Sequence, residues 1–408
     1  MRRARAMTSM LATFGWLCAA HAMTGLLALL LLVSLLYATA PLYLFAESRP
    51  FAGARWYNPY GELTAPGRWQ KASFHAHSMA WGGATNGRQS AEQVASAYQS
   101  MHYDIVGLSN YHSMSAAART STFPVYEQGW NVQKAHRLAI GGDAIVWRDY
   151  PLGQTVHQKQ DIINRIALTG AVVVLAHPAL RGGHSTADLR QLSGYDALEV
   201  LTHFVPPATT QWDAALSSGR AVWAMANDDS HDVRRAGETG VSWTLLHAPS
   251  SRPDDVRAAI RAGRLIGVRG AGGQAQLAFV SQRMVGDTLE VRVRGPVGGV
   301  AFTAQDGLPR TAVVTVAHGV TTARAVARPT DGYVRATVSG TGAADRELLL
   351  LNPVIRWDGQ LLGAGPATVN GPRTAALRWF ACCVYAAAFT SMHARRRRRV
   401  PSARPVQV

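Results

Sequence analysis

Apolar and polar residues are arranged in two different ways along this chain. From Gly61 to Arg269, short apolar runs of the strand type alternate with segments in which apolar residues recur at helical spacing. The helical segments begin as helices usually do; Ser90, for example, is followed three residues later by Gln93, the pattern of a capping box. This alternation predicts an α/β domain built on a parallel sheet or barrel, with functional residues at the carboxyl ends of the strands.

After Gly270 the pattern changes to a residue-by-residue alternation of apolar and polar side chains, interrupted by Gly and Pro. Typical segments are "DTLEVRVRG" and "GYVRATVSG". Such alternation indicates antiparallel strands with one face buried and one face in solvent. We therefore expect an α/β domain at 61–269, followed by a small antiparallel β module at 270–372.

The first 47 residues have the composition of a membrane segment. No charged residue lies between Arg5 and Glu47, and the apolar stretch Thr24–Phe45 is long enough to cross a bilayer. A cleaved signal peptide is the competing interpretation, because Ala38–Ala40 ("ATA") resembles a cleavage site. Pro41 directly after that site favours an uncleaved transmembrane helix over cleavage, and a hairpin of two spans ranks third.

The last segment, 373–408, is either a second transmembrane span or a basic tail. Ala376–His393 is apolar apart from Arg378, and five arginines follow it directly. The net charge of +16 is concentrated at both chain ends. Because basic residues stay on the cytoplasmic side, this distribution predicts cytoplasmic termini and an extracytoplasmic middle, periplasmic or extracellular. The charge therefore indicates membrane topology before it indicates nucleic-acid binding.

All three cysteines, Cys18, Cys382 and Cys383, lie in the apolar terminal segments. The part between them has neither a disulfide framework nor a thiolate metal site. Any metal ion there must be bound by His, Asp or Glu.

Side chains that bind metal ions recur where strand-like runs end. His75 and His77 are one residue apart, so in a strand they point to the same face. A single histidine of this kind is equally compatible with a buried core residue, but repeated placement at strand ends favours a shared site. Imidazoles and carboxylates suit Zn, Mn or Fe, and a carboxylate can bridge two ions of a hydrolytic site. The candidates are His75, His77, Asn110, His112, Glu127, His136, His177, Glu199, Asp229 and His231.

The order of these motifs resembles the PHP superfamily, named for polymerase and histidinol phosphatase. The shared order is His-x-His, a Thr-Asp-His-like element, Pro-x-x-Glu, a His before an apolar strand, Ala-His-Pro, Glu-Val and Asp-x-His. It covers Ala72 to Asp232, more loosely to Trp357. The branch that contains carbaryl-hydrolase-like proteins is the most similar. The resemblance implies a distorted (β/α)7 barrel, two or three divalent metal ions, and hydrolysis of phosphoesters or related esters.

The resemblance also implies roles for individual residues. One ion would be bound by His75, His77, Glu127 and Asp229, and Glu127 would bridge to a second ion bound by His136 and His177. His231 would complete a neighbouring position. His231 or His112 is the expected proton donor to the leaving group. Arg181, Arg234 and Arg235 are candidates to contact the anionic oxygens of a substrate.

One element departs from the family pattern. Where Thr-Asp-His is expected, the chain has Ser109, Asn110 and Tyr111, and His112 comes one place late. A shift of one residue turns a side chain to the opposite face of a strand, so His112 can act as a ligand only if the backbone bulges or the strand has ended. Asp143 is a second candidate carboxylate, but Glu127 fits the Pro-x-x-Glu element better.

We therefore expect a membrane-anchored, metal-dependent hydrolase, a phosphoesterase that uses a metal-activated water. Its expected partners are a small-molecule phosphoester and the membrane. Nucleic acid is not among them, because no interleaving of aromatic and basic residues is visible. The alternatives are a noncatalytic membrane-anchored binding protein, in which "SNYH" marks a decayed metal site, and a nucleic-acid-processing nuclease.

Overall fold

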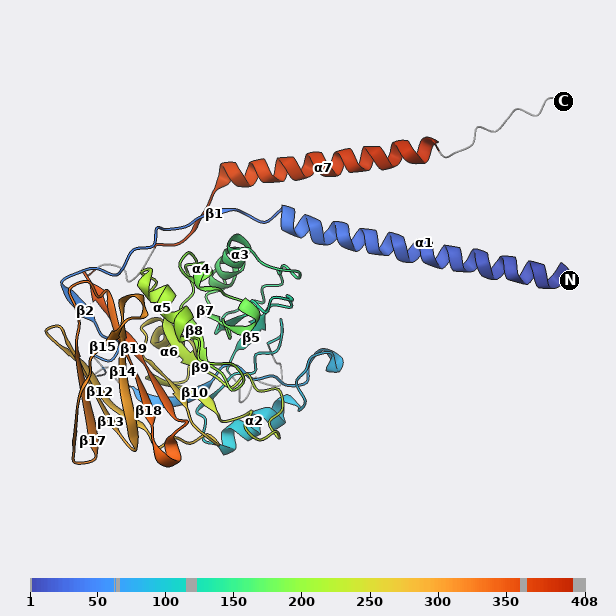
Figure 1. The fold of residues 1–408 in the computed structure, drawn as a ribbon. Coiled ribbons are helices and arrows are strands. Elements are labelled where there is room, and N and C mark those ends of the chain that lie inside the picture. Colours follow the sequence, from blue (N-terminus) through green and yellow to red (C-terminus); the bar gives the residue numbers. More distant parts are fainter. Residues whose placement is uncertain (1, 62, 64–66, 115–122, 360–364, 399–408) are drawn as a thin grey trace, which may run out of the picture. The chain divides into compact units, whose positions relative to one another are not determined.

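The computed structural model describes residues 2–61, 63, 67–114, 123–359 and 365–398. Two compact units are present: a terminal unit of Met1–Leu44 with Val369–Val408, and a central unit of Phe45–Thr368 (Figure 1). The predicted α/β domain and β module thus both belong to the central unit.

The terminal unit contains the long helices α1 (Arg2–Ala38) and α7 (Gly371–Arg398) and the short strand β1 (Tyr43–Leu44). The hydroxyl of Tyr385 in α7 donates a hydrogen bond of 2.8 Å to Ser34 Oγ in α1. Helix α1 ends three residues before Pro41, because proline cannot continue a helix and disfavours helical backbone in the residue before it. The last seven residues of the predicted apolar stretch therefore lie outside the helix.

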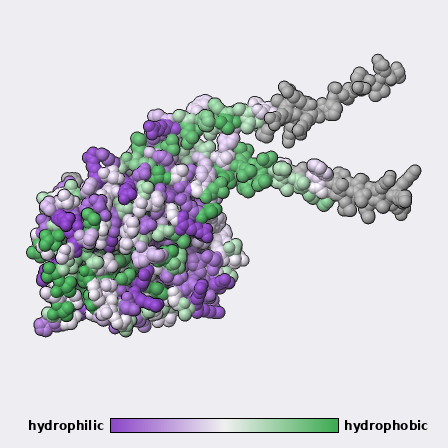
Figure 2. All heavy atoms as spheres, in the orientation of Figure 1, coloured by the Kyte–Doolittle hydropathy of each residue, from purple (hydrophilic) through white to green (hydrophobic). Residues whose placement is uncertain are grey.

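Helix α1 carries a continuous apolar surface. Phe14–Ala38 is long and apolar enough to cross a membrane, and it is the one helix of the described chain that is. Leu26, Leu29 and Leu32 are each more than half exposed, and Figure 2 shows apolar residues along this helix. A membrane anchor and a signal sequence both have this character. Helix α7 spans the predicted second transmembrane segment but does not reach the same apolar character.

One sheet of the central unit has five strands. In spatial order these are β5 (Val125–Gln128), β6 (Arg137–Ile140), β7 (Val172–Leu175), β8 (Ala197–Leu201) and β9 (Trp223–Ala226). Strands β7, β8 and β9 run parallel, as predicted. Strand β6 is antiparallel to both of its neighbours. The eight residues between β5 and β6 are too few for the crossover that a parallel connection needs, so this pair must be antiparallel.

A second sheet has nine strands and runs across the boundary predicted at residue 270. Its order is β15 (Pro309–Arg310), β14 (Val297–Ala304), β18 (Tyr333–Gly340), β19 (Leu348–Trp357), β11 (Leu265–Arg269), β10 (Ser242–Ala248), β3 (Arg68–Ser73) and β4 (Ile105–Val106), with β2 (Arg55–Tyr57) paired to β19. The pairing of β11 with β19 joins the two predicted domains through backbone hydrogen bonds. An antiparallel sheet of β12 (Ala278–Val285), β13 (Thr288–Arg294), β17 (Val320–Val326) and β16 (Val313–Ala317) completes the β-rich part, and β20 (Thr368–Val369) follows it.

Isolated backbone bridges connect the five-stranded sheet to β3 and β4 at both of its edges. On the β5 side, Gly107 pairs with Phe123 and Tyr111 with Glu127. On the β9 side, Ala76 pairs with Ser230. These bridges bring the residues that follow β3 close to those in β5 and after β9.

Short helices connect the strands: α2 (Ala91–Ser100), α3 (Val156–Ala167), α4 (Thr186–Leu189), α5 (Thr209–Ser217) and α6 (Pro253–Arg261). Single turns of 3-10 helix occur at η1 (Trp81–Gly83), η3 (Leu180–Gly182), η4 (Gln305–Gly307) and η5 (Gly342–Ala344). The capping box predicted at Ser90 and Gln93 is confirmed: both of its hydrogen bonds form at the start of α2. The strands of the five-stranded sheet are buried throughout, which explains their continuous apolar runs.

Candidate metal centre

The ends of five strands place six of the predicted ligands together. His75 and His77 follow β3, Glu127 lies in β5, His136 precedes β6, His177 follows β7 and Asp229 follows β9. None of the six is more than 4% exposed. Imidazoles and carboxylates at this density in a dry interior require partners for their polar atoms.

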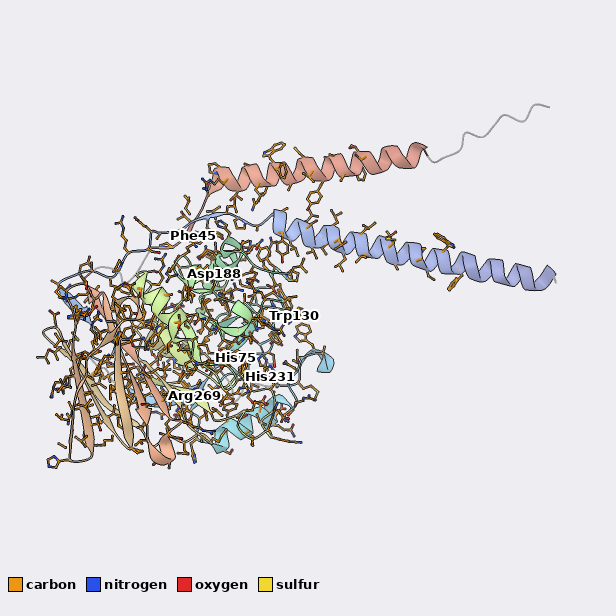
Figure 3. All side chains as sticks on the ribbon, in the orientation of Figure 1. Phe45, His75, Trp130, Asp188, His231 and Arg269 are labelled. Atoms are coloured by element: carbon orange, nitrogen blue, oxygen red, sulfur yellow. The ribbon has the colours of Figure 1, made fainter. Side chains whose placement is uncertain are left out.

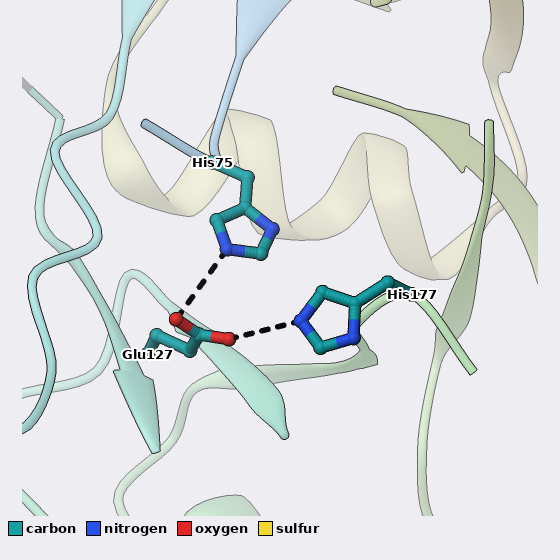
Figure 4. Close-up of side chains that lie close together, drawn as sticks. All are labelled: His75, Glu127 and His177. Atoms are coloured by element: carbon teal, nitrogen blue, oxygen red, sulfur yellow. Dashed lines mark hydrogen bonds and ion pairs between the residues drawn. The ribbon is translucent and has the colours of Figure 1, made fainter. Parts of the chain in front are cut away.

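Glu127 lies at the centre of this cluster (Figure 4). Its Oε2 atom is 3.5 Å from His75 Nε2 and 3.2 Å from His77 Nε2. Its Oε1 atom is 2.5 Å from His136 Nδ1 and 3.2 Å from His177 Nε2. The two oxygens of one carboxylate thus face two different sets of imidazoles, which is the arrangement of a bridging ligand.

Asp229 contacts the same histidines from the opposite edge of the sheet. Its Oδ1 atom is 3.0 Å from His75 Nε2 and 3.1 Å from His77 Nε2, and Oδ2 is 3.9 Å from His177 Nε2. Two groups of three have all their donor atoms within 4.8 Å of one another: His75, Glu127 and His177, and His75, His77 and Asp229.

The donor atoms of the cluster fit divalent metal ions. Within the described residues, His75 Nε2 and Glu127 Oε2 lie close to other donor atoms but form no hydrogen bond with them, and His77 Nδ1, His136 Nε2 and His177 Nδ1 have no hydrogen-bond partner either. Such atoms are rare in folded proteins, and an ion is one reason for them. Nitrogen and oxygen donors without thiolates suit Zn, Mn or Fe.

The electrostatics of the cluster lead to the same conclusion. Burial by itself would lower the pKa of His75, but the charges of Asp229, Glu199 and Glu127 raise it well above its usual value. Burial would raise the pKa of Glu127, but His136 and His75 hold it well below the usual range. The carboxylates thus favour positive charge on His75 and His77, a role that a divalent cation would take over.

Glu199 in β8 lies behind the cluster. Its Oε1 atom is 2.9 Å from His75 Nδ1, and its Oε2 atom accepts a hydrogen bond of 2.9 Å from the backbone N–H of His177. Asn227 Nδ2 donates to Oε1 at 2.9 Å. A carboxylate in this place orients a ligating histidine and makes it a stronger donor.

The backbone is strained at two of the predicted ligands. His177 has a φ of 28° and Asp229 a φ of 55°, in the left-handed region that non-glycine residues seldom adopt. The N–H of Asp229 donates to His75 O at 2.9 Å, which holds that conformation in place. Strain of this kind is concentrated at functional sites.

His231 lies at the exposed side of the cluster. Its ring stacks on His77 with centroids 4.4 Å apart, and its side chain is 22% exposed. Nδ1 donates a hydrogen bond of 2.9 Å to Asp229 O, so the lone pair is on Nε2, which has no partner within the described chain. Burial, with the charge of His77, lowers the pKa of His231 to about 4, so the ring is neutral at pH 7.

His112 lies outside the cluster. Its Nδ1 atom donates to Val146 O at 3.1 Å, and its Nε2 atom accepts from the N–H of Gly129 at 3.1 Å. Both nitrogens are therefore occupied by backbone groups. Its neighbour Tyr111 faces the cluster instead and stacks on His77 with centroids 5.0 Å apart. The late histidine thus does not take the place of the missing ligand.

Two further candidates also lie elsewhere. Asn110 binds the segment after β3: its Oδ1 accepts from the N–H of Ser78, and its Nδ2 donates to Ser78 Oγ. Asp143 is exposed and takes no part in the cluster.

Comparison with known proteins adds little to this geometry. No protein-family model matches the sequence, and no curated protein matches it. A solved structure that matches is a two-domain protein containing a predicted PHP-like metal-dependent phosphoesterase from Bacteroides vulgatus ATCC 8482. It is 12% identical, with 75% of this chain and 99% of that chain covered, and the TM-score is 0.38. At that score the site must be judged on its own contacts, and the PHP resemblance stays an expectation.

The sequence did not predict the roles of two residues next to the ligands. Asn227 orients Glu199, and Asp228 accepts hydrogen bonds from the backbone N–H groups of Gly240, Val241 and Ser242. Asp228 thereby fixes the loop that carries Asp229. A carboxylate directly before a predicted ligand is only weak evidence for such a structural role, since Asp occurs commonly in exposed turns.

Proposed function

We propose that this chain is a membrane-anchored, metal-dependent hydrolase of the PHP type that acts on small-molecule phosphoesters. The observation that carries the proposal is Glu127, a buried carboxylate whose two oxygens face separate sets of imidazoles. The bridges at both edges of the five-stranded sheet support a distorted (β/α)7 barrel in which the strand ends converge.

The contacts suggest how two metal ions would be bound. One ion would take His75, His77 and Asp229, and a second would take His136 and His177, with Glu127 shared between them. A third ion lacks an obvious ligand, because His112 is bound to backbone groups. When present, such ions supply a nucleophilic water near neutral pH and stabilise the charge on the phosphoryl oxygens.

The chain itself orients the ligands and moves the proton. Glu199 keeps His75 Nε2 directed at Glu127 and Asp229, and burial keeps bulk water away from the donor atoms. We assign His231 as the proton carrier: neutral Nε2 accepts the proton released when water attacks phosphorus. The P–O bond to the leaving group then breaks, and the same proton passes to the leaving oxygen, which yields an alcohol and a phosphate.

We further propose that α1 remains as an uncleaved anchor and that the central unit faces the extracytoplasmic side. The basic residues at the start of α1, Arg2, Arg3 and Arg5, support this orientation through the positive-inside rule. The mass of the mature protein, measured by mass spectrometry, decides between an anchor and a signal peptide. A mature chain that retains residues 1–47 supports the anchor, and a chain cleaved within this range contradicts it.

The activity test uses the full chain in detergent with p-nitrophenyl phosphate and its diester. Glu127→Gln removes the bridging charge at constant shape, and Glu92→Gln, on the exposed surface of α2, is the matched control. We expect turnover that chelation abolishes and Zn or Mn restores, absent in Glu127→Gln and retained in Glu92→Gln. Hydrolysis that survives both chelation and Glu127→Gln would contradict the proposal.

A noncatalytic binding protein is the second candidate, favoured by the position of His112 outside the cluster. It predicts that the wild-type chain binds metal yet hydrolyses no phosphoester, diester or carboxylic ester under any metal loading.

A further inference from the structure

A second site lies in the central unit, in a cavity of about 720 Å³ that no ligand of the metal centre lines. Its walls are the loop after β9, the segment that follows β11, and the turn between β18 and β19. Cavities of about 300–1,000 Å³ accommodate small molecules. The volume therefore exceeds what an ordered water or a single inorganic ion needs.

Three arginines from separate segments line this cavity: Arg234, Arg269 and Arg346. Arg269, labelled in Figure 3, is partly buried. Its Nη2 atom donates a hydrogen bond to Thr202 O at 3.2 Å. Within the described chain, none of the three guanidiniums lies within 4.0 Å of a carboxylate oxygen, although Asp232 Oδ1 accepts the backbone N–H of Arg234 at 3.0 Å. Arg234 and Arg346 are exposed, whereas Arg269 is partly buried; within the described residues its charge has no carboxylate partner, and an anion from outside the chain can supply one.

The two acidic residues that line the cavity offset only part of the charge of its four arginines. Glu347 is buried, and its Oε2 atom already accepts the backbone N–H groups of Gln276 and Leu277 at 2.8 and 3.0 Å. Asp345 is exposed and has no ion pair within the described residues. A fourth arginine of the lining, Arg235, lies 3.8 Å from Glu238. Positive charge therefore exceeds negative charge around the cavity.

The remaining lining leaves room for a ligand and supplies a further polar group. A methyl group placed on Gly237 or Gly272 would meet no atom within 4 Å, so these glycines border open space. His203 donates from Nδ1 to Asp228 O at 2.6 Å, which leaves Nε2 for a ligand. Because Asp228 precedes Asp229, this wall is attached to the loop that carries the metal ligands.

We propose that this cavity binds the phosphate group of a small organic molecule. The planar fork of arginine matches phosphate oxygens, and several guanidiniums together suit a doubly charged group better than a single carboxylate. The site goes beyond the proposed hydrolase: it needs no metal ion and holds whether or not the metal centre turns over a substrate.

The test is the binding of inorganic phosphate to the full chain in detergent, measured by calorimetry after the metal has been stripped and the chelator removed. Arg269→Met and Arg346→Met remove one charge each, the latter on an exposed turn where folding is unaffected. We expect saturable binding that weakens at least about tenfold in each variant, because each loses a charged hydrogen-bond donor to the phosphate oxygens. Arg294→Met, an exposed arginine outside the cavity, is the matched control and should bind as wild type does.

Other outcomes overturn the proposal. One is an absence of phosphate binding, and another is an equal loss of affinity in Arg294→Met. A third is binding that disappears in His77→Ala but persists in Arg269→Met, because that result would assign phosphate to the metal centre. Glycerol 3-phosphate and phosphatidic acid, compared at equal concentration in the same detergent, separate the two sources of the group. Binding of the lipid alone would contradict a small-molecule ligand.

Discussion

At the scale of single residues, Glu199, the carboxylate behind the cluster, holds two of the predicted ligands in place. One oxygen of Glu199 holds His75 Nδ1, and the other holds the backbone of His177, where φ is strained. The orientation of both imidazoles therefore depends on one side chain that contacts no metal position.

Glu199→Gln tests this role. The amide keeps the shape but removes the charge behind His75, so we expect metal affinity to fall about 10–100-fold. Metal titration against a competing chelator measures it, with Glu92→Gln as the control. Unchanged affinity would mean that Glu199 is only a packing residue.

His231→Gln separates proton transfer from metal binding. If His231 is the proton carrier, the variant should have a kcat about 10²–10⁴-fold lower than wild type, while its metal content stays at the wild-type value. Elemental analysis of the same samples decides the point: a variant that loses metal together with activity would make His231 a ligand.

Six of the candidates expected from the sequence meet in the cluster, whereas Asn110, His112 and Asp143 lie outside it. His75, His77, Glu127 and Asp229 could be predicted because strand alternation and position after apolar runs are local properties. The displacement of His112 depends on where the strand ends and on Gly129 and Val146, which the local pattern does not encode.

At the scale of elements, contacts between distant segments were the features that the sequence did not predict. The helix start at Ser90 is encoded within four residues and was predicted correctly. The pairing of β11 with β19 joins residues 79 to 85 positions apart, so no local pattern signals that the α/β part and the β module share a sheet. The antiparallel β6 follows from a connection length that strand patterns alone do not reveal.

Asn352 in β19 tests the joint between those parts. It is fully buried, accepts from the N–H of Ala224 at 2.7 Å and donates to Gly263 O and Leu265 O at 3.2 and 3.0 Å. Asn352→Leu leaves these three backbone groups without a hydrogen-bond partner, and we expect a loss of about 3 kcal/mol in the free energy of unfolding. Urea unfolding measures it; Asn86→Leu on the surface should change it by less than about 0.5 kcal/mol, and equal effects of the two would contradict the joint.

At the scale of the whole molecule, the two units have different surfaces. The central unit has a buried apolar core, whereas α1 exposes a row of leucines whose apolar surface is unfavourable in water. This contrast could be predicted from the sequence because an apolar run without charges is the strongest single pattern in the chain.

Deletion of residues 2–44 tests which helix anchors the protein. We expect the full chain to sediment with membranes and to resist alkaline extraction, and the shortened chain to be released into buffer with its metal content unchanged. A shortened chain that stays in the membrane fraction would contradict this expectation and would assign a membrane span to α7 as well.

The central claim is that the buried imidazoles and carboxylates bind metal. The most direct measurement is the metal content of the full chain purified in detergent without chelator, beside His75→Ala/His77→Ala, with circular dichroism of both to confirm folding. The account predicts about two ions of Zn, Mn or Fe per chain, as in binuclear hydrolytic sites, and a marked fall in the double variant. A folded wild-type chain that contains no metal and takes up none when Zn, Mn or Fe is added would contradict it.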